Sequence, residues 1–395
     1  MINSNFTKLL LAFFLSLGGD WLYKVALPLL VYQTTKDAVA MGAVYATTFA
    51  PYLFVTPFGG AIADRYHRKA VLLFGDLSAT IFVFALGLLS SSNFSIALLP
   101  LVFIIASIES AYHPAFNSII PEIVQPDQLS KANSYISTTE NLIGIIGPLF
   151  AGVMVASIGA INTLYVNAFS FFISFVLISQ ISYQSRSIEK DTNQSIMKDI
   201  QQGFHETFKN KFIKYACLLF FFENFAIHIF EGNLFFFLKD ILRLTDSQVG
   251  IALSIGGIGA IIGSLCAPSL TKLLPEGRLI LICSILSGIS GLLITLSKGY
   301  LQFSIAWSFV LCFNSIIVVT YFTLRQKVVD INLLGRVVSV TRLIAYAAIP
   351  IATVAGSFLI KSQGVELVIV IFGSILIACG CLGWLTPLSN DEKVI

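Results

Sequence analysis

The sequence predicts an all-α membrane protein, with twelve transmembrane helices arranged in two pseudo-symmetric six-helix bundles. Three observations support this fold class: an apolar composition, twelve long apolar runs, and a weak repeat between the two halves. Of the 395 residues, 56% are hydrophobic and only 11% are charged, whereas a soluble protein carries about 25% charged residues. The net charge of +3 is too small to suggest a nucleic-acid partner.

Twelve apolar runs are long enough to cross a bilayer, because a transmembrane helix needs about 20 apolar residues. The connections between them are mostly short, so neighbouring helices should be antiparallel. The expected spans are 8–32, 39–63, 70–91, 95–119, 132–156, 160–183, 212–237, 248–271, 279–297, 300–324, 335–360 and 364–386.

One polar connection near the midpoint divides the chain into two predicted domains. Residues 184–210 are rich in polar and charged side chains, with six expected spans on either side, which predicts bundles at 1–183 and 211–395. Apolar residues recur at helical spacing within the connection, and they indicate either a short amphipathic helix on the cytoplasmic face or a plain linker. These residues are Ile196, Met197, Ile200, Phe204 and Phe208.

The distribution of basic residues places both termini in the cytoplasm. In that orientation, seventeen of the 24 Lys and Arg residues lie on the cytoplasmic side, five lie outside and two lie within spans. An odd number of spans would scramble this asymmetry, so it supports the count of twelve.

Two pairs of segments correspond between the halves. Residues 263–278 occupy the place in the second half that residues 59–69 hold in the first, although they lack its Asp-Arg pair. Residues 121–152 and 328–356 each contain a polar turn, a Leu, a basic residue and then a long helix with a Pro. Two related six-helix bundles around a central cavity are a known transporter design.

The sequence contains no motif typical of an enzyme or a cofactor site. Its six Cys residues lie within apolar runs and lack paired metal-ligand spacing, so we expect small apolar side chains and no metal site. A phosphate-binding loop, a nucleophile elbow and a zinc-protease helix motif are all absent. We therefore expect no catalytic residues, no cofactor and no direct use of ATP.

Ionisable side chains inside a span cost several kcal/mol unless they are paired or wetted, so they mark candidate functional sites. Asp20 and Lys24 lie four residues apart on one face of the first span, either as a structural ion pair or as a proton carrier and its regulator. Glu109 and His113 share a face of the fourth span. They could handle a proton or substrate, or form a structural pair, whereas a metal site would need further ligands.

Further candidates lie in the second half. Asn224, His228 and Glu231 follow i, i+4, i+7 spacing and form one polar stripe on the seventh span, with Glu223 off this stripe. Arg342 lies within the eleventh span. Its partner should be an acid that faces the cavity, either Glu231 or an acid of the fifth span.

The fifth span combines an acid with a stripe of small residues. Glu140, Gly144 and Gly147 share one helical stripe, and Pro148 and Gly152 follow. This pattern predicts a helix that bends and packs closely against its neighbours. Glu140 is the second candidate partner for the arginine of the eleventh span.

An ordered hydrophilic loop lies between the second and third spans. Residues 59–69 contain Gly60, then Asp64 with Arg65, then Arg68 before a final Lys. The small residue allows close helix approach, and the basic residues hold the loop in the cytoplasm. The order of these residues resembles the signature loop of the major facilitator superfamily.

The resemblance to this superfamily extends over nearly the whole chain and is strongest for the twelve-span drug:proton antiporter branch, which includes macrolide efflux proteins and the enterobactin exporter. Residues 114–134 are the most specific for the branch. Residues 147–152 are similar to the antiporter motif Gly-Pro-x-x-Gly-Gly, although Ala151 replaces one Gly.

The resemblance also implies a conformational gate on the cytoplasmic side. In such proteins, the Asp of the loop braces the start of span 11, and its Arg meets an acid near the end of span 4. The corresponding residues here are Asp64 against the region of Arg336, and Arg65 or Arg68 against Glu122.

We therefore expect a secondary active transporter in a bacterial inner membrane. It should export amphipathic small molecules, drug-like or siderophore-like, by alternating access in exchange for protons. We expect it to act as a monomer whose partners are its substrate, protons and the lipid bilayer. The alternatives are a lysophospholipid flippase of the same fold and a transporter of siderophores or metal chelates.

Overall fold

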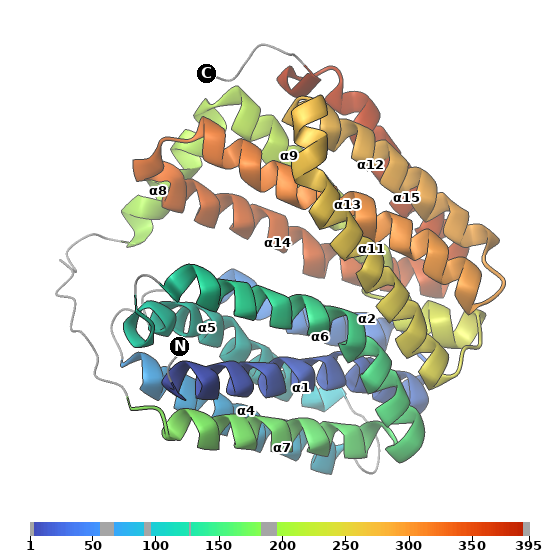
Figure 1. Ribbon diagram of the computed structural model, residues 1–395. Coiled ribbons are helices and arrows are strands. Elements are labelled where there is room, and N and C mark those ends of the chain that lie inside the picture. The colour runs from blue at the N-terminus through green and yellow to red at the C-terminus, as the bar shows by residue number, and fades with distance from the viewer. Residues whose placement is uncertain (1–3, 56–66, 91–95, 126–127, 183–195, 390–395) are drawn as a thin grey trace. The chain divides into compact units, whose positions relative to one another are not determined.

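The computed structural model describes residues 4–55, 67–90, 96–125, 128–182 and 196–389, and these residues form α-helices joined by short turns (Figure 1). The chain divides into two compact units. Unit 1 is Met1–Glu189 with Arg243–Ser254, and unit 2 is Lys190–Leu242 with Ile255–Ile395. The division near residue 189 falls within the polar connection expected at 184–210. Residues 243–254 group with unit 1, although the sequence assigned them to the second bundle.

Unit 1 contains six of the described helices and a short 3-10 turn before α5. The side chain of Asp37 caps the second helix, because its Oδ1 accepts a hydrogen bond of 3.1 Å from the backbone N–H of Val39. The helices are α1 (Ser4–Thr35), α2 (Ala38–Phe54), α4 (Arg68–Leu89), α5 (Leu99–Ile123), α6 (Leu129–Ile158) and α7 (Ala160–Ser179).

Unit 2 contains the remaining described helices, and the first turns of α11 group with unit 1. Asn210 caps α9, accepting a 3.2 Å hydrogen bond from the N–H of Ile213. The elements are α8 (Ile196–Lys209), α9 (Lys211–Glu231), α10 (Leu234–Phe236), the π-turn η3 (Phe237–Ile241), α11 (Asp246–Leu273), α12 (Glu276–Leu293), α13 (Tyr300–Val328), α14 (Ile331–Gln363) and α15 (Val365–Gly383).

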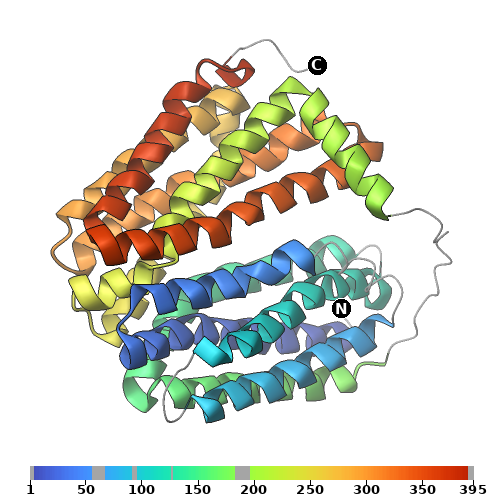
Figure 2. The ribbon, with the colours of Figure 1, turned by 180° about the vertical axis from the view of Figure 1, so that it is seen from behind.

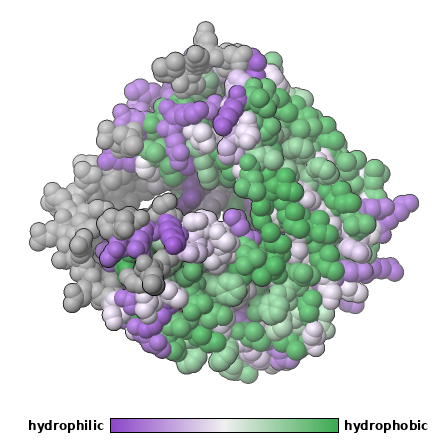
Figure 3. Space-filling model, viewed as in Figure 1, coloured by the Kyte–Doolittle hydropathy of each residue, from purple (hydrophilic) through white to green (hydrophobic). Residues whose placement is uncertain are grey.

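The expected membrane fold is confirmed. Among the described residues, eleven helices are long and apolar enough to cross a membrane, and α2 supplies a shorter apolar helix over Ala38–Leu53. Large apolar side chains face outward, such as Phe74 at 73% exposure. Figure 3 shows hydrophobic residues across the middle of the helices and hydrophilic residues gathered toward their ends. This surface suits a lipid environment.

The seventh expected span, 212–237, is not one continuous helix. α9 ends at Glu231, and the chain then turns through Asn233 into α10 and the π-turn η3. Asn233 is fully buried, and its side-chain oxygen accepts a 3.0 Å hydrogen bond from Ser357 of α14. This contact satisfies the side-chain oxygen of Asn233 at the break, which sequence periodicity alone does not reveal.

Each unit has its own apolar core. In unit 1, the core draws on α1, α4, α5, α6 and α7, and the rings of Phe13 and Phe116 stack with their centroids 4.5 Å apart. In unit 2, the core draws on α9, α11, α12 and α13, and Phe220 stacks on Tyr321 at 4.4 Å.

The internal repeat is visible at equivalent points in the two units. A glycine with positive φ joins the last two helices of each: Gly159 (φ 83°) between α6 and α7, and Gly364 (φ 90°) between α14 and α15. The ammonium of Lys69 donates to the carbonyl of Ser179 at the end of α7, at 2.7 Å. Arg278 likewise donates to the carbonyl of Ser389 after α15, at 2.9 Å.

The helix expected in the polar connection is present as α8, the light-green helix that precedes α9 in Figure 2. The face of α8 that packs against α14 is not the apolar face that the sequence predicts. Gly203 and Thr207 are buried, and Gly203 lies against the backbone of Arg336 in α14. Phe204 and Phe208 stack on each other and remain 37% and 43% exposed.

Candidate functional site

A polar cavity of about 80 Å³ lies inside unit 1. It is bordered by α1, α2, α4, α5 and α7, and it is large enough for a few water molecules. Polar or ionisable side chains from four helices line it. They are Ser16, Asp20 and Lys24 from α1, Tyr52 from α2, Asp76 from α4, and Glu109 and Tyr112 from α5.

The face of α1 that borders the cavity carries Ser16, Asp20 and Lys24 at four-residue intervals. In the described part of the chain, no ion pair joins Asp20 to Lys24. One carboxylate oxygen of Asp20 is buried without a hydrogen-bond partner among the described residues. The exposed ammonium of Lys24 lies 5.4 Å from the centroid of the Trp21 ring, as in a cation–π contact.

α5 contributes the half-buried Glu109 and Tyr112 to the same cavity. Gly75 of α4 makes room for the tyrosine ring, because a Cβ at this position would lie 2.9 Å from Tyr112 Cδ2. The ring of Tyr112 also stacks on Phe116, with centroids 6.4 Å apart. The side chain of His113, the proposed partner of Glu109, lies outside the described part.

The cavity contains an acid that the sequence reasoning missed. Asp76 of α4 is only 1% exposed, and its Oδ2 accepts a 2.6 Å hydrogen bond from Ser174 of α7. The signal was available, since an acid within the apolar run 70–91 is as unusual as the acids of the first and fourth spans.

The charges in this cavity do not balance if every acid is ionised. Three carboxyl groups, from Asp20, Asp76 and Glu109, share the cavity with one ammonium group, from Lys24. Buried carboxylates without counter-charges cost several kcal/mol. The cavity therefore favours bound protons or a cationic group.

The polar residues expected on the seventh span lie in the second half of α9, and His228 and Glu231 pair with each other among the described residues. His228 Nδ1 lies 3.1 Å from a carboxylate oxygen of Glu231. The amide of Asn224 donates instead to the carbonyl of Phe220 in its own helix, at 2.7 Å. Arg342 is exposed on α14, and it forms no ion pair with Glu231 among the described residues of unit 2.

The small residues of α6 have different environments. A Cβ at Gly147 would lie 2.6 Å from the Trp21 ring of α1, so this glycine allows close packing. Gly144 has open space within 4 Å, and Glu140 is exposed. A Cβ at Gly152 would meet the Cα of Gly250, also in unit 1, at 2.7 Å. Pro148 lies within the continuous helix α6.

The gate residues are described only in part. Gly60, Asp64 and Arg65 lie outside the described residues. Arg68, at the start of α4, forms a 2.6 Å ion pair with Glu122 near the end of α5. The same guanidinium donates to the carbonyl of Ser118 at 2.9 Å.

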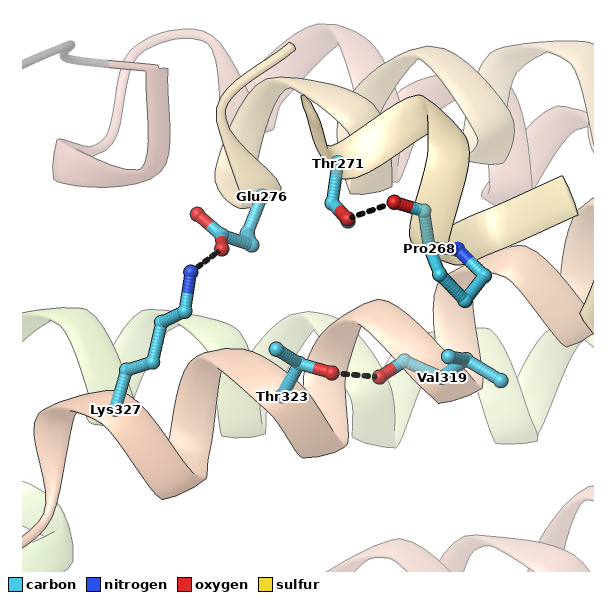
Figure 4. A network of polar contacts seen from close by, with 6 residues as sticks. All are labelled: Pro268, Thr271, Glu276, Val319, Thr323 and Lys327. Atoms are coloured by element: carbon cyan, nitrogen blue, oxygen red, sulfur yellow. Dashed lines mark hydrogen bonds and ion pairs between the residues drawn. The ribbon is translucent and has the colours of Figure 1, made fainter. Parts of the chain in front are cut away.

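Unit 2 contains a matching ion pair with its charges exchanged. Glu276 at the start of α12 pairs with Lys327 near the end of α13, and Figure 4 shows the two side chains directed toward each other. In unit 1 the base lies on the earlier helix, whereas in unit 2 the acid does. The repeat therefore preserves a helix-end ion pair although the sequence of the loop has changed.

Arg336, the other expected gate residue, lies near the start of α14. Its guanidinium donates to the side-chain oxygen of Gln202 in α8 at 2.6 Å. This contact ties α14 to the helix that follows the polar connection.

Among the described residues, no group of three or more His, Cys, Asp or Glu side chains has the arrangement of a metal site. The acids of the unit 1 cavity come from three different helices and share the site with a lysine. This arrangement can bind protons or one organic cation.

A family model described as Major Facilitator Superfamily matches residues 9–353. The chain belongs to this superfamily. It is similar to the staphyloferrin A transporter of Staphylococcus aureus, at 25% identity over 282 residues, which cover 70% of this chain and 70% of that protein. Macrolide efflux protein A of Streptococcus pyogenes is 25% identical over 384 residues, covering 92% of this chain and 91% of that protein.

The fold agrees with this membership. The crystal structure of the nucleoside transporter NupG matches with a TM-score of 0.79 at 16% identity, covering 97% of this chain and 99% of that one. At this identity the likeness shows the fold alone. The chain is therefore a multi-pass membrane transporter and not an enzyme. Its resemblance to efflux proteins is confirmed.

Proposed function

We propose that this transporter exports amphipathic small molecules from a bacterial cell in exchange for protons. The observation that carries the proposal is the cavity in unit 1, where three carboxyl groups meet one ammonium group. The similarity to a macrolide efflux protein supports export of drug-like molecules. Alternating access would expose the cavity to each side of the membrane in turn.

The excess of acids gives a physical route to coupling. With protons bound, Asp20, Asp76 and Glu109 are neutral and can remain in a closed, poorly hydrated cavity at low cost. A cationic or polar group of the substrate that enters the cavity would favour the ionised acids and release protons. Proton and substrate then compete for the same charges, which is the requirement for exchange.

The direct test uses inverted vesicles with an imposed pH gradient and a fluorescent amphipathic cation as substrate. Glu109→Gln should abolish uptake driven by the gradient and leave substrate binding measurable. Glu366→Gln changes an exposed acid at the start of α15 and serves as the matched control. Gradient-driven uptake by Glu109→Gln equal to that of the control would remove Glu109 from the coupling site.

The gate is proposed at the ends of α4 and α5. The Arg68–Glu122 ion pair is mostly buried, with side-chain exposures of 15% and 9%, so its loss should cost more than that of a surface pair. Arg68→Glu and Glu122→Arg should each reduce transport, and the double exchange should restore part of it. A double variant that is as inactive as the singles would argue against a gating role for the pair.

A siderophore or metal chelate is the second candidate substrate. The similarity to the staphyloferrin A transporter supports it. A binding screen by thermal shift should compare siderophores with and without iron against macrolides. Stabilisation by a siderophore alone would favour this alternative over drug export.

The lysophospholipid alternative is supported by an apolar groove of about 320 Å³ between α9 and α15 in unit 2. Tyr215 and Phe222 line it from α9, and Ala378 and Leu382 line it from α15. Filling the groove by Ala378→Phe should then block transfer of a labelled lysolipid in proteoliposomes. Unchanged transfer would argue against this use of the groove.

A further inference from the structure

Unit 2 also contains a buried acid. Glu223 of α9 is 1% exposed, and its Oε1 is hydrogen-bonded to the hydroxyl of Ser284 in α12. The same hydroxyl lies 2.8 Å from the carbonyl oxygen of Leu376 in α15. One serine oxygen thus connects three helices that are distant in sequence.

The number of hydrogens at Ser284 decides the protonation of Glu223. A hydroxyl has one hydrogen to donate, and a backbone carbonyl can only accept. If Ser284 donates to Leu376, its oxygen can only accept from the glutamate side chain, which must then be the donor. We infer that Glu223 binds a proton, and that this neutral acid donates to Ser284, which donates to Leu376.

An ionised Glu223 would fit this site poorly. Ser284 could then donate its one hydrogen to the carboxylate or to the carbonyl of Leu376, and the other acceptor would lose its donor. The second oxygen of Glu223 is buried without a hydrogen-bond partner among the described residues. A carboxylate in this position would lack the compensation that a buried charge requires.

No cation from the neighbouring helices is engaged with Glu223 in the described part of the chain. The titratable groups that face it are the thiols of Cys283 in α12 and Cys379 in α15. Arg325 of α13 donates to Thr341 and lies over the Tyr321 ring, 5.5 Å from its centroid. Arg342 of α14 is exposed.

The acid–serine contact of unit 1 is arranged differently. There, Ser174 donates to Asp76 at 2.6 Å, and no carbonyl among the described residues competes for the serine hydrogen. Asp76 can accept this bond in either protonation state. Only the site in unit 2 therefore requires the proton on the acid.

The proton at Glu223 also determines which side-chain hydrogen bonds join α9, α12 and α15. When it is lost to water, the Ser284 hydroxyl turns toward the new carboxylate and no longer donates to Leu376. The side-chain bond between α12 and α15 is then broken, while α9 and α12 remain joined. Unit 2 therefore contains a proton-binding site that controls one helix contact, whatever ion drives transport.

Infrared spectroscopy of the full-length protein in D₂O tests the bound proton. The wild type should show the carbonyl band of a protonated carboxylic acid at neutral pH, and Glu223→Gln should remove one such component. Glu366→Gln, the exposed control, should leave it unchanged. A spectrum of Glu223→Gln identical to that of the wild type in this region would overturn the inference.

A second variant keeps the test independent of how well Glu223→Gln folds. Ser284→Ala retains the acid and removes its hydrogen-bond acceptor, so the acid band should move to higher frequency. The inference fails if the band keeps its position in Ser284→Ala, since Glu223 would then not be the group bonded to Ser284.

Hydrogen–deuterium exchange of α15 tests the helix contact. Exchange over Val365–Gly383 should be compared between the wild type and Glu223→Gln at each pH, which cancels the intrinsic pH dependence of exchange. We expect equal protection at low pH and faster exchange in the wild type once its acid band has disappeared. Equal protection after the band disappears, or a band that never disappears, would overturn the control of the contact by the proton.

Discussion

The acids in the membrane-spanning helices differ in their hydrogen-bond partners and in their burial. Asp76 has a serine donor from α7, whereas one oxygen of Asp20 lacks a hydrogen-bond partner among the described residues. Glu109 borders the same cavity and is half-buried. Because all three share one small cavity, a change at one should alter proton binding at the others.

Asp76→Asn tests whether the acid of α4 belongs to the proposed coupling site. An amide oxygen can still accept from Ser174, so the free energy of unfolding should change by no more than about 1 kcal/mol. Proton-driven transport should nevertheless fall to the level of vesicles without the protein. Vesicle uptake and thermal unfolding of the same preparations check this, with Glu366→Gln as control. Normal uptake would exclude Asp76 from the coupling site.

Two glycines of α6 that share a helical stripe should respond oppositely to alanine. A Cβ at Gly147 would lie 2.6 Å from the Trp21 ring, whereas a Cβ at Gly144 would meet nothing within 4 Å. Gly147→Ala should destabilise the protein by roughly 1–3 kcal/mol. Gly144→Ala should stabilise it by up to about 1 kcal/mol, through helix propensity. Thermal unfolding in detergent measures both, and equal shifts would contradict the packing described for α6.

At the scale of elements, the contact between α8 and α14 depends on small residues. Gly203 brings the backbone of α8 against the carbonyl of Arg336, and Gln202 accepts a hydrogen bond from the Arg336 guanidinium. The phenylalanines that gave α8 its apolar spacing remain partly exposed. They could rest at a membrane surface while the glycine side of the helix packs on α14.

Gly203→Ala should loosen α8 from α14, because the new Cβ would lie 2.6 Å from the carbonyl oxygen of Arg336. A backbone atom cannot move aside as a side chain can, so we expect a loss of roughly 1–3 kcal/mol. Gly335→Ala is the matched control in α14, since its Cβ would meet nothing within 4 Å. Hydrogen exchange over residues 201–209 should rise only in Gly203→Ala.

For the whole molecule, the two units share several structural features although their sequences repeat only weakly. Gly159 and Gly364 join equivalent helix pairs, and the ion pairs Arg68–Glu122 and Glu276–Lys327 lie at equivalent helix ends with their charges exchanged. The direct attraction between an acidic and a basic side chain does not depend on which helix carries the base. This explains why the repeat survives in three dimensions where the loop sequence has diverged.

The orientation of the whole chain is predicted by its basic residues. A fluorescent protein fused after residue 395 should fluoresce in cells, because the positive-inside rule places the C-terminus in the cytoplasm. Alkaline phosphatase inserted after Lys298 should be active, because this residue is expected outside. The opposite pattern of fluorescence and phosphatase activity would show that the chain is inverted.

Much of the fold could be predicted from the apolar runs, since long apolar helices have few alternatives in a bilayer. The sequence reasoning also selected Asp20, Lys24 and Glu109, which line one cavity. It missed Asp76, whose hydrogen-bond partner Ser174 lies in a helix distant in the chain. The break after Glu231 could not be predicted because apolar residues continue across it, and the serine that bonds the side-chain oxygen of Asn233 comes from α14.

Composition and the spacing of apolar runs by themselves determined the membrane class, the helical architecture and the helices that carry charge. The tertiary structure decided which charges share a cavity, which face of α8 is buried, and that Ser284 stands between Glu223 and the carbonyl of Leu376. The physical reason is that lipid constrains each span separately, through its length and apolarity. The partner of a buried polar group comes from a helix distant in the chain, and local periodicity carries no information about that partner.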